Sequence, residues 1–328
     1  MSDDATTRDA EAILARHGKS FRFASRFMEP GDARDAALLY RVCRELDDLA
    51  DQEMPTEAQN RDAHRRLAQV REELVNDRGN DLLSRLLLDL QRRRGLDTRA
   101  AVALIDALIE DVESPALIVD ETRLLRYCYG VAGAVGVLMC PVVGAPQSAT
   151  PHGIDLGLAM QMTNIARDVR EDAEMGRRYL PADWVEGMTP ADIATADERQ
   201  QMLVSGAIDR LLSLAERYYA SAADGFVAIP GRNRRAIAVA ADVYRAIGWR
   251  LYRQRLAWWQ GRVVVPLPTK LWLATRRGLG RGAIRAAGRN DHDASLHRAI
   301  ADLPGAHDAA GISRVDPRLL AADSAIHE

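Results

Sequence analysis

Apolar residues recur at three- and four-residue spacing along nearly the whole of this chain. The segments DLLSRLLLDLQRR (81–93) and RLLSLAERYYASAADGFV (210–227) show this spacing most clearly, and it is the period of an amphipathic α-helix. No Asn-Gly or Asp-Gly hairpin turn separates two alternating apolar runs. The sequence therefore predicts an all-α protein of about ten helices. The expected breaks contain proline or glycine and lie near Pro30–Gly31, Gly79, Pro115, Pro141–Pro151, Pro181–Pro190, Gly231 and Pro266–Pro268.

The overall composition is that of a soluble globular protein, with 47% hydrophobic and 28% charged residues. A net charge of −3 implies no nucleic-acid partner. Cys43, Cys128 and Cys140 form neither a disulfide framework nor a zinc-binding spacing, and they suit a reducing cytosol. The N-terminal segment MSDDATTRDAEA is acidic and unlike a secretory signal, so we expect a cytoplasmic protein.

The composition changes near residue 290, beyond which the chain is polar and rich in Gly, Pro, Asp and Ala. Segments of this kind bury too little apolar surface to order themselves. We therefore expect one folded helical domain over residues 1–290 and a loosely ordered tail over residues 291–328.

Residues 128–151 contain no charged side chain, and a stretch of this length is long enough to span a membrane. The same stretch contains several helix-weakening residues, namely Gly130, Gly133, Gly136, Pro141 and Gly144. These residues favour a buried helix that lines an apolar pocket, and a membrane span is the alternative.

Residues 243–290 contain no Asp or Glu. They hold many basic residues (Arg245, Arg250, Arg253, Arg255, Arg262, Lys270, Arg276, Arg277, Arg281, Arg285 and Arg289) interleaved with Trp249, Tyr252, Trp258, Trp259 and Trp272. One interpretation is a solvated basic face whose aromatic residues anchor it in the core. The other is a surface that rests on an anionic membrane or helps to hold a phosphate group. Nucleic-acid binding ranks third because no nucleic-acid motif accompanies the charge.

Asp-x-x-x-Asp spacing occurs three times, at Asp47/Asp51, Asp77/Asp81 and Asp168/Asp172. Side chains at this spacing share one face of a helix, where like charges destabilise it by about 0.2–0.5 kcal/mol per pair. The middle pair flanks a turn-like RGN sequence, and we set it aside. The other two pairs lie in uninterrupted helical sequence, with Asp48 and Glu171 beside them. A bound cation is the first candidate to offset the repulsion.

Two such acidic helices facing each other would form a site lined by hard oxygen ligands. Mg²⁺ binds through a few carboxylates, waters and the phosphate oxygens of a substrate. Arg44 and Arg167 lie next to the two pairs, and arginine adds charge-assisted hydrogen bonds to phosphate. The alternative is that each acidic pair belongs to the solvated face of its own amphipathic helix.

Five segments, in this order along the chain, resemble motifs of the squalene/phytoene synthase family. They are RHGKSFRFASRFM (16–28), YRVCRELDDLAD (40–51), LLRYCYGVAGAVGVLMCPVVG (124–144), QMTNIARDVREDAEMGRRYLPADW (161–184) and GRVVVPLPTKLWLATR (261–276). The fourth segment is most similar to the bacterial phytoene synthases. Ahead of the third, the family has an acidic residue, matched by Asp111, and then an Arg-Tyr-x-Thr stretch. Here Leu117–Ile118 stands in place of that Arg-Tyr.

The resemblance implies the isoprenoid-synthase fold, a single helical bundle around a deep central cavity with the two aspartate-rich helices facing each other across it. It also implies head-to-head condensation of two prenyl diphosphates with Mg²⁺ or Mn²⁺ as cofactor. The leading assignment is synthesis of phytoene from two geranylgeranyl diphosphates through a cyclopropylcarbinyl (prephytoene) diphosphate, the first committed step of carotenoid biosynthesis. Proton loss would end that reaction. The lack of a GxGxxG fingerprint favours a reaction that does not require NADPH.

The match to these motifs also implies a set of site residues. The metal ions would be held by Asp47, Asp51, Asn164, Asp168 and Asp172, and Tyr244 would join the four aspartates as a catalytic residue. The substrates would contact Ser20, Phe21, Tyr40, Arg44, Tyr127, Val131, Gly133, Gln161, Asn164 and Arg167. In this assignment the arginines hold phosphate oxygens, the tyrosines present ring faces or hydroxyls to a cation, and the small residues let a prenyl chain lie against the helix.

Two alternatives to phytoene synthesis stay open. Within the family, the chain could make squalene or dehydrosqualene from farnesyl diphosphate. Outside it, the chain could be a non-catalytic assembly factor with the same fold, although its intact acidic pairs argue against this. The enzyme hypothesis predicts that Asp168→Ala abolishes turnover and leaves the fold intact, on the reasoning that this carboxylate has no partner. An oily product and a soluble substrate would suit a protein that rests on the surface of a membrane.

Overall fold

The structure is a computed structural model that describes residues 9–307 except 11, 15–18, 52–55 and 279–291. Within this part the chain is helical, and its only β-type pairing is an isolated bridge between Leu117 and Arg178. The α-helices are α2 (Lys19–Ser25), α3 (Pro30–Ala50), α4 (Glu57–Val75), α5 (Leu82–Arg94), α6 (Thr98–Glu113), α7 (Glu121–Cys128), α8 (Ala134–Val142), α9 (Thr150–Glu174), α10 (Pro190–Ala194), α11 (Glu198–Gly225), α12 (Gly231–Arg253) and α13 (Leu267–Gly278). The predicted all-α class is therefore confirmed.

Shorter helical turns complete the fold. A π-helical turn over Tyr129–Gly133 joins α7 to α8 without a break, so that the two helices form one continuous rod. The 3₁₀ turns are Gln147–Ala149, Ala182–Trp184, Phe226–Ala228, Trp258–Gln260 and Ala294–Ile300.

The helix ends follow local signals that the sequence carries. Thr56 caps α4 by accepting a hydrogen bond from the backbone N–H of Gln59, whose side chain accepts from the backbone of Thr56 in return. Such a capping box satisfies two N–H groups that the helix leaves unpaired. Gly95 ends α5 in a left-handed conformation with φ of 76°, which glycine adopts at little cost.

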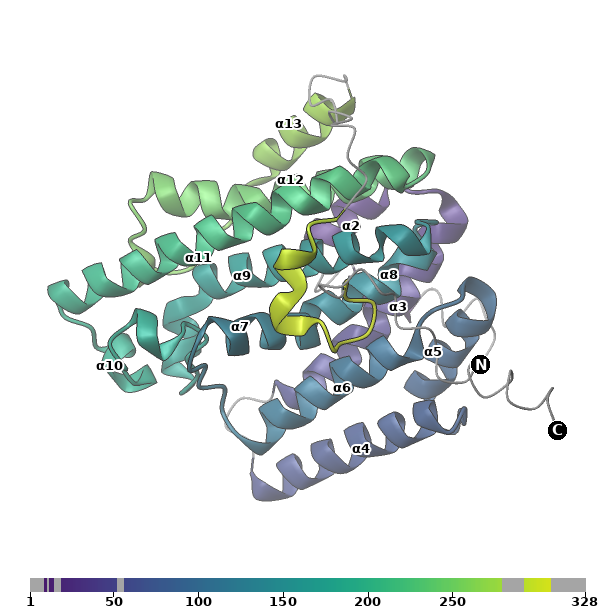
Figure 1. Cartoon of the computed structure of the whole chain (residues 1–328), viewed down its shortest axis with the longest axis horizontal. Helices are drawn as coiled ribbons and strands as arrows, with labels where there is room; N and C mark the ends of the chain where they lie inside the picture. Colours follow the sequence, from purple (N-terminus) through teal and green to yellow (C-terminus); the bar gives the residue numbers. More distant parts are fainter. Residues whose placement is uncertain (1–8, 11, 15–18, 52–55, 279–291, 308–328) are drawn as a thin grey trace.

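Helix α9 lies in the middle of the bundle and packs against α8, α10, α11 and α12 (Figure 1). The helices α4 and α13 lie on opposite sides of the molecule in this view. One continuous apolar core contains residues from Ala10 to Ile300. The described helices therefore form one unit around α9.

Glycines allow α8 and α9 to approach each other closely. A Cβ atom on Gly136 of α8 would lie 2.2 Å from the carbonyl oxygen of Gly153, and one on Gly157 of α9 would lie 2.3 Å from that of Ala132. Contacts this short do not occur between real atoms, so both positions require glycine. A Cβ on Gly133 would lie 2.7 Å from Cδ1 of the Leu158 side chain, so this glycine also lies close against α9. Its part in leaving room for a prenyl chain stays a prediction.

The continuous rod Glu121–Val142 is long and apolar enough to cross a membrane, with a mean hydropathy of 1.4 over its most apolar window. Of that window, 56% is buried inside the molecule, where the rod packs against α6 and α9. A core helix also passes this test of length and composition, so the finding is weak evidence for a membrane span.

The predicted loose tail is corrected for residues 292–307, which pack against the bundle (Figure 1). Arg126 of α7 forms an ion pair with Asp302 at 2.6 Å and also donates to the carbonyl of Ala299. The hydroxyl of Tyr129 donates to the carbonyl oxygen of Pro304. A polar composition suggested a tail, but specific hydrogen bonds hold this segment in place. Residues 308–328 lie outside the described part.

Candidate active site

The two acidic pairs come together at one end of the bundle. Asp47 lies in the last turn of α3 and Asp51 directly follows this helix, whereas Asp172 lies near the end of α9. Arg177, just after α9, donates to Asp51 with 2.7 Å between Nη1 and Oδ1. The charges of Asp51 and Asp168 both act on Asp172. The structure thus places the carboxylates of α3 beside those of α9, as the motif assignment expects.

Two of these carboxyl groups have strongly raised pKa values. Burial, then the like charges of Asp168, Glu171 and Asp51, raise the pKa of Asp172 to about 7 against the opposing effect of Arg177. Burial and the neighbouring carboxylates raise the pKa of Asp47 to about 6, although Arg44 opposes the change. The site therefore holds more negative charge than its arginines balance, which is the condition that favours a bound cation.

Asp168 differs from Asp172 because two arginines bind it. Arg167 donates from Nε to Oδ1 at 2.7 Å, and Nε of Arg262 lies 2.9 Å from the same oxygen. Asp172 has no ion-pair partner in the part of the chain that the structure describes. The expectation that Asp168 has no partner is therefore wrong, and Asp172 is the carboxylate without an ion-pair partner among the described residues.

Two buried side-chain oxygens at the site have no hydrogen-bond partner among the described residues. They are Oδ1 of Asn164 and Oε2 of Glu171. The amide of Asn164 is oriented by Gln161, since Nδ2 lies 3.4 Å from Oε1 of that residue. An unpaired buried oxygen is costly, and carbonyl and carboxylate oxygens are the ligands that Mg²⁺ and Ca²⁺ prefer. The residues present therefore fit a divalent cation bound through oxygen.

An aromatic group adjoins the acidic residues. The ring of Phe21 lies 5.9 Å from that of Tyr40 and 5.6 Å from that of Tyr244, measured between centroids. Burial raises the pKa of Tyr40 to about 12, and burial also raises the pKa of Tyr244, which is close enough to Arg167 and Asp168 to feel their charges. Both hydroxyls thus stay protonated, and their electron-rich rings can face a cation.

Tyr127 belongs to a second polar group. Its ring stacks on that of Tyr179 at 4.9 Å, and its hydroxyl lies 3.3 Å from Oδ2 of Asp111. Burial raises the pKa of Asp111 to about 6, with Arg177 opposing the shift. The structure connects this group to the acidic pairs through Arg177, which also binds Asp51.

The remaining predicted substrate residues lie near these groups or outside the described side chains. Arg44 binds Asp47 and Asp48, with Nη1 3.1 Å from Oδ2 of Asp47. Val131 is half-buried in the π-helical turn and packs against the core. Ser20 lies in α2, but its side chain is outside the description.

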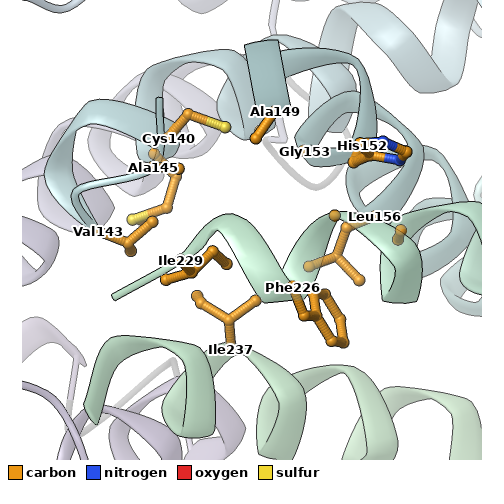
Figure 2. Close-up of a pocket in the computed structure, with 14 residues that line it drawn as sticks. Cys140, Val143, Ala145, Ala149, His152, Gly153, Leu156, Phe226, Ile229 and Ile237 are labelled. Atoms are coloured by element: carbon orange, nitrogen blue, oxygen red, sulfur yellow. The ribbon is translucent and has the colours of Figure 1, made fainter. Parts of the chain in front are cut away.

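An apolar cavity of about 60 Å³ lies at the other end of α9 (Figure 2). Side chains from α8, α9, α11 and α12 and from the connecting turns line it, including those of Met139, Val143, Leu156, Phe226, Ile229 and Ile237. Gly153 at this cavity precedes Asp168 by 15 residues of continuous helix, a distance of about 22 Å at 1.5 Å per residue. The acidic site and the apolar cavity are thus at opposite ends of one helix.

Sequence reasoning missed several residues at the acidic site. Arg177 and Tyr179 both lie inside the motif 161–184. A basic residue directly after an acidic helix could have indicated that Arg177 balances a carboxylate. Arg262 lies inside the family-like segment 261–276 and the basic stretch 243–290 but was assigned no part in the site, and its contact with Asp168 joins residues 94 positions apart. Nothing in local spacing indicates such a contact.

Comparisons with known proteins show which family the chain belongs to. Residues 14–269 match the family model described as squalene/phytoene synthase. A phytoene synthase of Pseudescherichia vulneris is 35% identical over 259 residues, which is 76% of this chain and 83% of that protein. A 15-cis-phytoene synthase of Paracoccus sp. (strain N81106 / MBIC 01143) is 37% identical over 275 residues, covering 78% of this chain and 87% of that protein.

The solved structures include a dehydrosqualene synthase in complex with ligand. It is 26% identical and superposes with a TM-score of 0.74, covering 85% of this chain and 98% of that chain. The fold is that of an all-α isoprenoid synthase, an enzyme of the prenyltransferase class. The chain belongs to the squalene/phytoene synthase family.

Proposed function

We propose that this enzyme condenses two molecules of geranylgeranyl diphosphate head to head to give phytoene, with Mg²⁺ bound between the aspartates of α3 and α9. The main observation behind the proposal is that the two acidic pairs lie close together, next to several arginines and an aromatic group. The relatives named as phytoene synthases support the choice of product.

The acidic residues would act in the departure of diphosphate. Asp47, Asp51, Asp172, Asn164 and Glu171 offer the oxygen ligands for the metal, which when bound supplies positive charge to the departing diphosphate. Arg44, Arg167 and Arg262 lie around these carboxylates and suit the phosphate oxygens by their planar, bidentate geometry. Asp168 holds Arg167 and Arg262 in place, so we assign it to positioning these arginines as well as to metal binding.

The reaction needs two steps, which balance as follows. In the first, the C1–O bond of one substrate breaks and pyrophosphate leaves. C1 then bonds to the C2–C3 double bond of the second substrate, and loss of a proton closes the cyclopropane of prephytoene diphosphate. In the second, the remaining pyrophosphate leaves, the carbon skeleton rearranges and a second proton is lost to form the central double bond.

The aromatic group would protect the cationic carbon. The ring of Phe21 lies 5.9 Å from that of Tyr40 and 5.6 Å from that of Tyr244, and a ring face attracts a cation by about 0.5–2 kcal/mol. Such faces stabilise positive charge without offering a nucleophile. The apolar cavity at the other end of α9, about 60 Å³ in volume, is too small for a whole prenyl chain, so we assign it no part in holding the substrates.

Dehydrosqualene synthesis from farnesyl diphosphate is the second candidate, favoured by the structural likeness to a dehydrosqualene synthase. A product analysis separates the two. Purified enzyme with Mg²⁺ is given each diphosphate in turn, with and without NADPH, and the lipids are extracted. A C40 triene from the C20 substrate without NADPH supports the proposal. A C30 product alone would replace it with the second candidate, and no product from either substrate would favour a non-catalytic scaffold.

We further propose that α13 and the segment before it rest on an anionic membrane surface. Val264 and Leu267 are mostly exposed, and Leu271 and Trp272 are exposed by 50% and 55%. The guanidinium of Arg276 lies 5.5 Å from the ring centroid of Trp272. The sequence of residues 243–290 contains no Asp or Glu, and exposed apolar residues within such a basic stretch are typical of surfaces that bind anionic lipid.

Vesicle co-sedimentation tests this membrane contact. We expect the enzyme to bind vesicles that contain anionic phospholipid, to bind neutral vesicles less and to be released by salt. Leu271→Ser should weaken binding. Val75→Ser, which changes an equally exposed valine (53%) at the end of α4, is the matched control and should have no effect. Equal binding of the Leu271→Ser variant and the control would place the contact elsewhere.

A further inference from the structure

Four of the seven histidines of the chain gather in one place, away from the acidic site. His152 lies on α9, whereas His292, His297 and His307 come from the C-terminal segment that crosses the bundle, coloured yellow in Figure 1. The ring of His292 lies 4.3 Å from that of His297, 5.5 Å from that of His307 and 5.2 Å from that of His152, between centroids. Chance does not gather most of a rare residue type at one buried point.

A carboxylate lies at the centre of this group. Oδ2 of Asp155 is 2.9 Å from Nε2 of His292, and Oδ1 is 2.9 Å from Nε2 of His297. The three side chains are buried, with exposed fractions of 0%, 2% and 0% for Asp155, His292 and His297. Ser221 of α11 also donates to Oδ2.

We propose that Asp155, His292 and His297 bind a divalent transition-metal ion, with Zn²⁺ the occupant that the donor set fits best. Two imidazole nitrogens and one carboxylate oxygen are typical zinc ligands, whereas Mg²⁺ prefers oxygen alone. The three donor atoms lie within 4.8 Å of one another. Bonds of 2.0–2.1 Å in a tetrahedral site put ligand atoms about 3.3 Å apart. The imidazoles now lie 2.9 Å from the two oxygens of Asp155 as hydrogen-bond partners, so the group has to open by only a few tenths of an ångström to take an ion. Water supplies the fourth ligand.

The protonation of the group matches this proposal. Burial would raise the pKa of Asp155, but hydrogen bonds from the two imidazoles more than offset it, so the pKa lies below its usual range. Burial is the largest effect on His297 and lowers its pKa. An ionised carboxylate and a neutral imidazole are the forms that bind metal. A buried carboxylate also needs a balancing positive charge, which the metal ion provides.

Metal binding would replace the two hydrogen bonds between Asp155 and the imidazoles and would change a third. The backbone N–H of His307 donates to Nδ1 of His297 at 2.9 Å, so in the metal-free state the ring proton of His297 is on Nε2 and is donated to Asp155. A metal at Nε2 moves this proton to Nδ1, and the N–H of His307 must then turn away. We therefore expect metal binding to change the backbone conformation at His307.

The proposed ion has a structural role, because it would link two parts of the fold, and it is separate from the acidic site. Asp155 precedes Asp168 by 13 residues of α9, about 20 Å along the helix. Its ligands join α9 to residues 137 and 142 positions further along the chain. Cross-links between such distant segments restrict the unfolded chain most, so the ion would fix the C-terminal segment on the bundle.

Metal analysis of the untagged, full-length enzyme tests the proposal. We expect about one zinc per chain after purification without chelator, loss of zinc and a lower Tm after chelation, and recovery of both on adding Zn²⁺. Cobalt added to the stripped enzyme should give the visible absorption of a tetrahedral site. His297→Gln should lose the metal, whereas His64→Gln, an exposed histidine on α4, should keep it. Asp168→Asn should also keep it, which separates this site from the acidic one.

The wild-type enzyme alone can decide the question, even if His297→Gln does not fold. If stripped wild-type enzyme takes up neither Zn²⁺ nor Co²⁺ stoichiometrically and its Tm is unchanged by them, the proposal is refuted. Asp155 would then be neutralised by a proton on one of its imidazole partners.

Discussion

Replacing Asp172 with asparagine should stabilise the metal-free enzyme and also inactivate it. The reason is the raised pKa of this carboxyl group, about 7 in the folded protein against about 3.9 in an unfolded chain. Above pH 7 the folded state must carry a negative charge that its surroundings disfavour. Asparagine has nearly the same shape and removes that charge.

The expected gain in stability of Asp172→Asn follows from the shift in the pKa of Asp172. Three pKa units correspond to about 4 kcal/mol of differential interaction. Solvent screens a partly exposed side chain, and asparagine still buries a polar amide, so we expect a gain of about 1–2 kcal/mol in the free energy of unfolding. This gain should be complete above about pH 7 and shrink as the pH falls, because the folded wild type then takes up a proton before the unfolded chain does. It should vanish near pH 4.

Thermal denaturation in metal-free buffer at pH 8 and pH 5 measures this gain. One kcal/mol shifts the Tm of a 328-residue chain by roughly 1.5 °C, so Asp172→Asn should raise Tm by roughly 1.5–3 °C at pH 8 and by much less at pH 5. Adding Mg²⁺ with pyrophosphate should raise the Tm of the wild type more than that of the variant. Product formation should fall at least about 100-fold, since a metal ligand is lost.

The matched control is Asp168→Asn, one turn earlier on the same helix. Asp168 binds Arg167 and Arg262, so its replacement breaks charge-assisted hydrogen bonds and should lower stability by about 1–3 kcal/mol. The two variants thus carry the same substitution with effects of opposite sign. If Asp172→Asn destabilised the metal-free enzyme at pH 8 as much as Asp168→Asn does, the assignment of an unbalanced charge to Asp172 would be wrong.

Three further outcomes are expected. Gly157→Ala should lower the free energy of unfolding by about 2 kcal/mol, because overpacking costs up to about 3 kcal/mol and the better helix propensity of alanine offsets about 1 kcal/mol of that cost. Gly206→Ala in α11 is the control. A Cβ there meets nothing within 4 Å, so this variant should have a higher Tm. The Mg²⁺ concentration for half-maximal activity should rise about tenfold when the pH falls from 8 to 6. The reason is that Asp172 and Asp47, with pKa values of about 7 and about 6, must lose protons to bind metal. If this Mg²⁺ concentration did not change with pH, the two aspartates would not be metal ligands. Tyr129→Phe should lower Tm by a few degrees and speed proteolysis of residues 292–307, because it leaves the carbonyl of Pro304 unpaired at a cost of about 1–3 kcal/mol.

The sequence predicted what depends on local pattern. Helical spacing gave the all-α class, and the acidic pairs on α3 and α9 were separated from Asp77/Asp81 by their helical context. The structure agrees, since Asp81 caps the N-terminus of α5 by accepting from the backbone of Leu83. Such features are predictable because they are decided within a few residues of the chain.

The missed features depend on contacts between distant residues. Arg262 contacts Asp168 across 94 positions and Arg177 contacts Asp51 across 126, so no local pattern shows which arginine balances which carboxylate. The C-terminal segment was misjudged for the same reason. Its composition is polar on average, yet His292 and His297 are buried because a single carboxylate on α9 accepts from both.

The glycine contacts between α8 and α9 link these features mechanically. Because the backbones of Gly136 and Gly153 touch, the spacing of the two helices is fixed by main-chain atoms, which cannot change rotamer. The acidic site, the apolar cavity and the Asp155 group all lie on α9, so their relative positions are set by one continuous helix. We infer that this close packing fixes α9 in the bundle, and with it the place from which its last turns present Asp168 and Asp172 to the carboxylates of α3.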